Sequence, residues 1–71
     1  MTILSNEEKL AIAQQHKRNL EYNKYNLDLT LIEENAVSSP KADVIASLTT
    51  EINELTNKIT AIDAEISSLT E

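Results

Sequence analysis

The second half of the chain places apolar residues at alternating steps of three and four, and this repeat strongly limits what the chain can fold into. Such a heptad pattern is typical of a coiled-coil helix, here with isoleucine at every a position and mostly leucine at d. The residues between the apolar positions are polar or small. The spacing therefore predicts one amphipathic helix over about 40–70, with its apolar seam at Ile45, Leu48, Ile52, Leu55, Ile59, Ile62, Ile66 and Leu69.

Two partners for this seam remain open. It can pack on another helix of the same chain, or it can pair with a second chain as an intermolecular coiled coil. Isoleucine at a with leucine at d favours parallel dimers when such a helix stands alone. The heptads by themselves do not decide between the two arrangements.

The start of the second helix is marked by Ser38, Ser39 and Pro40. Serine caps free N–H groups at a helix start, and proline suits the first helical position because it lacks that donor. We therefore expect Ser39 to be the N-cap. Proline also disfavours helical conformation in the residue before it, so the same stretch ends the preceding helix and forms a turn at about 38–40.

The first half opens with Ser5 and Glu8, whose spacing is that of a capping box. No glycine or proline interrupts the chain from there to about residue 37, which predicts a helix over about 6–37. Residues 25–31 alternate apolar and polar side chains as a half-buried strand would. A single strand has no partner in this chain, so we favour the helix.

In a helix over 6–37 the apolar side chains fall on two roughly opposite faces. The first face holds Leu10, Ala13, Leu20, Leu27 and Leu31, with Lys17 and Lys24 between them. A short connection predicts an antiparallel hairpin, in which residues with numbers summing to about 76 lie opposite each other. In that register the first face meets the heptad seam, and the two lysines can lay their stems along it while their charges reach water.

The second face is then left without cover inside the hairpin. We call it the tyrosine stripe; it consists of Tyr22, Tyr25, Leu29, Ile32 and Ala36. Exposed apolar patches mark interfaces, and tyrosine is enriched in interface hot spots. The sequence thus predicts an all-α antiparallel helical hairpin, a single domain over 1–71, assembled through the stripe into an oligomeric helical bundle. The alternative is a kinked first helix whose second face packs on its own chain.

Composition limits the chemistry that the chain can perform. It has no cysteine and no glycine, which excludes disulfides, thiolate sites and glycine-rich phosphate loops. His16 is the only histidine, and among lysine, arginine and glutamine neighbours it is expected to be a surface or packing residue. The carboxylate pairs Glu7/Glu8 and Glu33/Glu34 lie near helix ends, where we expect them to be solvated. We therefore expect no enzyme activity, no cofactor, no metal and no small-molecule substrate.

Charge and hydropathy bear on the partners. Six basic residues against twelve acidic ones give a net charge of −6, which argues against nucleic acid as a partner. No apolar run approaches the ~20 residues of a membrane span, and no secretory signal is visible at the start. The expected partner is therefore protein, and the expected location is the cytoplasm.

The runs Asn19–Leu27 and Glu33–Ala36, with the Ser-Ser-Pro junction and the Ile/Thr/Asn heptads, resemble small uncharacterised proteins of marine tailed bacteriophages. The resemblance spans most of the chain. It implies a phage product that acts in an infected bacterium or in a virion, and it assigns no functional residues.

From the sequence we expect a non-enzymatic protein–protein interaction module that self-associates through the tyrosine stripe in a structural or assembly role. The alternative is an adaptor or inhibitor that presents the same face to a different protein, for instance a host enzyme. A nucleic-acid accessory factor using Lys17, Arg18 and Lys24 is a weaker hypothesis, because acidic residues dilute that side of the helix.

Overall fold

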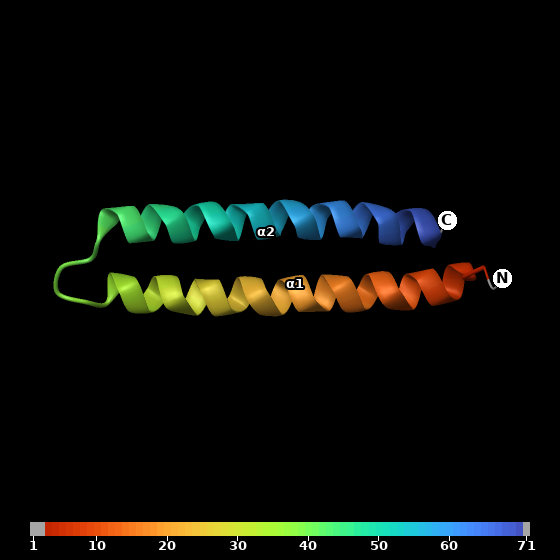
Figure 1. The fold of residues 1–71 in the computed structure, drawn as a ribbon, viewed down its shortest axis with the longest axis horizontal. Coiled ribbons are helices and arrows are strands. Elements are labelled where there is room, and N and C mark those ends of the chain that lie inside the picture. The colour runs from red at the N-terminus through yellow and green to blue at the C-terminus, as the bar shows by residue number, and fades with distance from the viewer. Residues whose placement is uncertain (1–2, 71) are drawn as a thin grey trace.

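The computed structural model describes residues 3–70, and over this range the chain forms two α-helices packed against each other as a hairpin (Figure 1). Helix α1 spans Asn6–Asn35 and helix α2 spans Ala42–Leu69. The predicted all-α hairpin is therefore confirmed. Residues 1, 2 and 71 of the predicted domain lie outside the described range.

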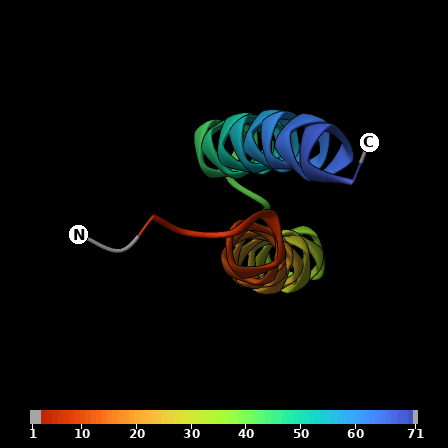
Figure 2. The same ribbon diagram turned by 90° about the vertical axis from the view of Figure 1, so that its right-hand side faces the viewer.

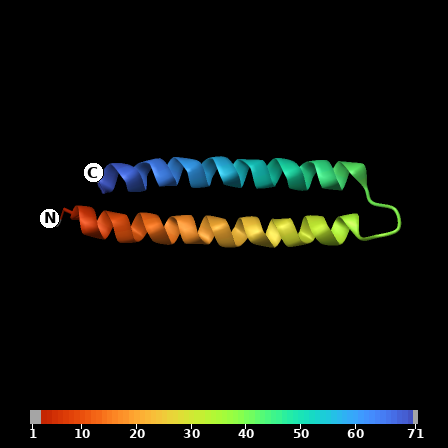
Figure 3. The same cartoon turned by 180° about the vertical axis from the view of Figure 1, so that it is seen from behind.

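The hairpin is a single layer, two helices wide and one helix thick. Its extents are 57 × 21 × 14 Å, and the end view shows the two helices side by side with nothing covering either of them (Figure 2). From behind, α1 and α2 again run next to each other over their whole lengths (Figure 3). Neither helix in the described part of the chain contains a stretch long and apolar enough to cross a bilayer.

Helix α1 begins at the predicted capping box. The Ser5 hydroxyl accepts a hydrogen bond from the backbone N–H of Glu8 at 3.1 Å, and the Glu8 carboxylate accepts one from the backbone N–H of Ser5 at 3.0 Å. Two N–H groups that a helix start leaves without intrahelical partners are thereby satisfied. The hydrogen bond from the Ser5 backbone, with a further contribution from the Ser5 side chain, lowers the pKa of Glu8 from its ordinary 4.5.

The turn differs from the prediction. Helix α1 ends at Asn35, the N-cap of α2 is Lys41 rather than Ser39, and Lys41 makes no side-chain capping bond. Packed helix axes lie ~8–10 Å apart, and the chain must cross this gap while it reverses, which takes residues that the sequence assigned to the helix ends. No described residue has a positive φ, so the turn closes without the glycine that the chain lacks.

Glu34 supplies the capping interaction that the serines do not. Its carboxylate accepts a hydrogen bond from the backbone N–H of Lys41 at 3.4 Å, across the turn. The Glu34 side chain is half-buried, whereas Glu33 beside it is exposed. Our expectation that both carboxylates are simply solvated was therefore wrong for Glu34.

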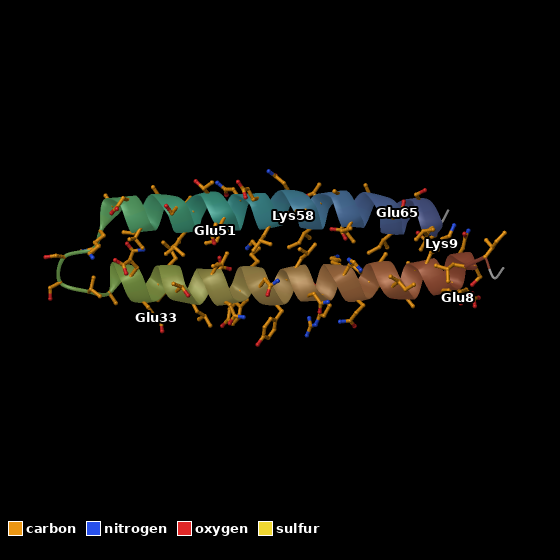
Figure 4. All side chains as sticks on the ribbon, in the orientation of Figure 1. Glu8, Lys9, Glu33, Glu51, Lys58 and Glu65 are labelled. Atoms are coloured by element: carbon orange, nitrogen blue, oxygen red, sulfur yellow. The ribbon has the colours of Figure 1, made fainter. Side chains whose placement is uncertain are left out.

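The face between the helices follows the predicted three–four spacing. All eight positions of the α2 seam are half-buried, and the only other half-buried residues of α2 are Val44 and Asp63. On α1 the half-buried positions are Leu10, Ala13, Lys17, Leu20, Lys24, Leu27, Asp28, Leu31 and Glu34. In this single chain the eight positions pack on α1, which is one of the two arrangements left open by the heptads, and Figure 4 shows side chains of both helices filling the space between them.

No side chain among residues 3–70 is fully buried. Each helix can be covered only on the side that faces its neighbour, so every apolar residue of the seam keeps part of its surface in water. A hairpin of this kind has a seam but lacks an enclosed core. Its folding stability therefore rests on many partly buried contacts.

We predict that Leu55→Ala lowers the free energy of unfolding by about 1–2 kcal/mol, less than the 2–5 kcal/mol typical of a fully buried leucine, because Leu55 is only half-buried. Urea unfolding followed by circular dichroism at one fixed protein concentration measures the change. Asn57→Ala, at an exposed position on the same helix, is the matched control and should change stability by less than about 0.5 kcal/mol. Equal losses for the two variants would contradict the seam.

The capping box predicts a pH dependence. Because folding lowers the pKa of Glu8, the stability that its carboxylate contributes is fully present above about pH 4.5 and is lost as the pH falls through the lower pKa of the folded state. Glu8→Gln removes this titration, so its stability should decline less steeply with acid than that of the parent chain. Glu7→Gln, in the same helical turn but outside the capping box, is the control and should retain the parent's steep decline.

Candidate protein-interaction surface

The tyrosine stripe lies on the side of α1 that faces away from α2, as the sequence predicts. Tyr22 is 70% exposed, Tyr25 62% and Ile32 64%, while Leu29 is 39% exposed. Ala36, just past the end of the helix, is exposed as well. Figure 4 shows side chains projecting from this far side of α1, the labelled Glu33 among them. The kinked helix that would bury this face on its own chain is not formed, since α1 is continuous over Asn6–Asn35.

The spacing of the stripe matches that of a helix-packing seam. Its members follow one another by steps of three, four, three and four, the same repeat that α2 uses to pack on α1. A second helix laid along α1 would therefore meet a continuous apolar row. Helix α1 thus has two regularly spaced apolar faces on roughly opposite sides, of which the hairpin covers one.

A shallow depression lies beside the two tyrosine rings. It is lined by Arg18, Asn19, Glu21, Tyr22 and Tyr25. Four of these residues (18, 21, 22 and 25) have the spacing of the four residues that surround a knob in coiled-coil packing. The depression therefore has the residue spacing of such a knob-accepting hole.

The stems of the two lysines lie half-buried along the α1 seam, as predicted, but both charges pair with carboxylates, whereas we expected them to reach water. Lys17 reaches Asp63 of α2, with 2.7 Å between Nζ and Oδ1, and Lys24 reaches Asp28 on its own helix at 3.4 Å. The hydrogen bond that Lys17 donates to the Asp63 carboxylate, together with the negative charge of Asp63, raises the pKa of Lys17 above its usual 10.5. The predicted register places Ile59 opposite Lys17, and Asp63 lies one turn beyond, within reach of the extended stem.

These two ion pairs bear on whether the basic residues of α1 form a surface that binds nucleic acid. The weaker hypothesis of a nucleic-acid factor needs Lys17, Arg18 and Lys24 as a free cationic patch. Two of the three are held by carboxylates on the hairpin's inner side, while Arg18 lies next to the tyrosine stripe. The arrangement does not bring the three charges together on one surface.

The sequence reasoning missed some exposed apolar residues at both ends of α1. Val37, in the turn after the helix, is 49% exposed. At the other end, Leu4 and Ile12 are 44% and 48% exposed and line a shallow hollow between the helices, together with Ala13, Ile62, Lys9, Glu65 and His16. They escape a periodicity search because each stands outside the two regular faces.

His16 is exposed at the margin of this hollow, which agrees with its expected place on the surface. Within residues 3–70 no three side chains of histidine, aspartate, glutamate or cysteine come together as a group that could hold a metal ion. The feature that stands out on this molecule is therefore the tyrosine stripe.

Comparison of the chain with protein-family models, with curated proteins and with solved structures found no match. The function is therefore inferred from the exposed surface of the hairpin.

Proposed function

We propose that this chain is a non-enzymatic structural or assembly protein, a helical hairpin that self-associates through the tyrosine stripe. The observation that supports the proposal is the second apolar face of α1, which is regular in spacing, rich in tyrosine and uncovered by α2. The resemblance to small phage proteins would place such an assembly in an infected bacterium or in a virion.

The exposed area of the hairpin supports a second copy as the partner. The chain exposes 5432 Å², whereas a folded monomer of its 7.9 kDa mass ordinarily exposes about 4,400 Å². The excess of about 1,000 Å² is similar to the ~800 Å² that each partner buries in a stable interface of standard size. The radius of gyration of 16.5 Å likewise exceeds the ~11 Å of a globular domain of this length.

The charges around the stripe are compatible with the binding of a second copy of the chain. Its five members are uncharged, and both an arginine and a glutamate, Arg18 and Glu33, flank it. The net charge of −6 keeps the remaining surface soluble and disfavours contact elsewhere. A self-associating hairpin of this kind thus has one apolar face that binds a second copy, and charged faces that do not.

An adaptor or inhibitor that offers the stripe to a different protein is the second candidate. The depression beside Tyr22 and Tyr25 supports this second candidate, because one side chain of a different protein could insert there. A hairpin with this role would be monomeric without its target. The oligomeric state therefore distinguishes the two proposals.

We expect light scattering over a hundredfold range of protein concentration to give a fixed oligomer at the upper end. Ile32→Asp should convert it to a monomer, because a carboxylate would have to be buried in the interface. Its helical circular dichroism should persist, since Ile32 faces away from α2. Leu29→Asp should act in the same direction.

The matched control is Asn57→Asp, which adds the same charge at an exposed position of α2 and should leave the mass unchanged. A folded monomer at every concentration would overturn self-association. A mass that grows without limit would overturn a closed assembly.

A further inference from the structure

Building on the self-association proposed above, we infer that two copies pair antiparallel through α1, with Tyr22 of each chain opposite Ile32 of the other. The starting observation is the series of residues on the outer face of α1. It consists of Arg18, Tyr22, Tyr25, Leu29, Ile32 and Ala36. The steps between them are four, three, four, three and four, which is the same sequence of steps in either direction.

That symmetry sets the register of an antiparallel pair. When the second helix runs in the opposite direction, all six residues lie opposite a residue of the same series along the helix axis only if paired residues have numbers summing to 54. Tyr22 then lies opposite Ile32, and Tyr25 lies opposite Leu29. Each tyrosine ring packs on an aliphatic side chain of the other chain, and the interface fills in layers as coiled-coil seams do.

The depression beside the tyrosines fits this register. Along the axis of α1, the centre of its lining residues 18, 21, 22 and 25 lies between Glu21 and Tyr22. In the antiparallel register the nearest side chain of the second copy is Ile32, which is 64% exposed in the single hairpin and free to insert. In a parallel pair the same depression would face the bulkier Tyr22 of the second copy.

The charges at the ends of the series favour the same orientation. Antiparallel pairing places Arg18 opposite the small Ala36, one turn from the exposed Glu33 of the second copy, so each end of the interface gains an arginine–carboxylate pair. In-register parallel pairing would place Arg18 against Arg18. It would also set Asp28 beside Glu33 of the second copy, because residues five apart flank a parallel seam.

One like-charge approach does occur in the antiparallel pair. The two Asp28 side chains lie on the same side near its centre. Each is already paired with Lys24 of its own chain at 3.4 Å, which offsets the repulsion. The balance of charges therefore remains in favour of antiparallel pairing.

The extent of the overlap agrees with where the apolar row ends. Continuing the repeat toward the N-terminus leads to Gln15, Ala11 and Glu8, which offer little apolar surface. In the antiparallel pair these positions lie beyond the second copy's α1 and need no cover. Because seam and stripe are on opposite sides of α1, the four helices form one layer in the order α2, α1, α1, α2, rather than a square bundle.

Spin labels test the orientation with the stripe intact. The chain contains no cysteine, so Gln14→Cys and Ser39→Cys, both at exposed positions, each carry a single label. In the antiparallel pair two labels at 14 are separated by about 40 Å along the helix axis. Two labels at 39 are separated by more than about 24 Å, because each lies in the turn beyond the end of its α1 at Asn35. A mixed dimer with one label at each site should instead show a distance below about 20 Å, because site 14 of one chain lies beside the turn that carries site 39 of the other.

Light scattering on the same labelled samples distinguishes a failure of the antiparallel orientation from a failure of self-association. A dimer with short same-site distances and a long mixed distance is parallel, and it would overturn this inference while leaving self-association in place. A monomer would overturn self-association and this inference with it. As the matched control, Ile32→Asp introduced into each labelled variant should abolish every distance between chains.

Discussion

Two packed helices can cover only one side of each other, and the rest of this structure depends on that limit. Because the hairpin is one layer thick, no side chain among its described residues is fully buried. Any apolar residue that is not on the shared seam must face water. Most exposed positions of both helices are therefore polar or small, and the tyrosine stripe is the clear departure from this pattern.

Much of the hairpin follows directly from local sequence patterns. The three–four spacing on α2 and the capping box of Ser5 and Glu8 are short-range features, with spacings that determine which side chains meet. The capping box forms as predicted, and the eight spaced positions of α2 are all half-buried. The exposure of Tyr22 and Tyr25 also followed, since one helix of a hairpin cannot bury two opposite faces. The interfaces that this exposure suggests stay predictions.

The parts that sequence reasoning missed depend on how the two helices meet in space. The Ser39 cap was a sound local inference, but the reversal of the chain moves the start of α2 to Ala42 and makes Glu34 the group that binds the Lys41 N–H. The Lys17–Asp63 ion pair joins residues far apart in sequence, and its geometry depends on the final register of the helices. No periodicity in either helix alone encodes these contacts.

In the proposed assembly α1 is the central helix, packed on α2 through one face and on a second copy through the other. The two tyrosines of the chain, Tyr22 and Tyr25, both lie on the outer face, and there is no tryptophan. Tyrosine fluorescence therefore reports on this face alone. The most direct test is acrylamide quenching of that fluorescence across a wide range of protein concentration. We predict that quenching weakens as the concentration rises and the rings become buried; rings that stay as accessible at high concentration as in dilute solution would contradict the account.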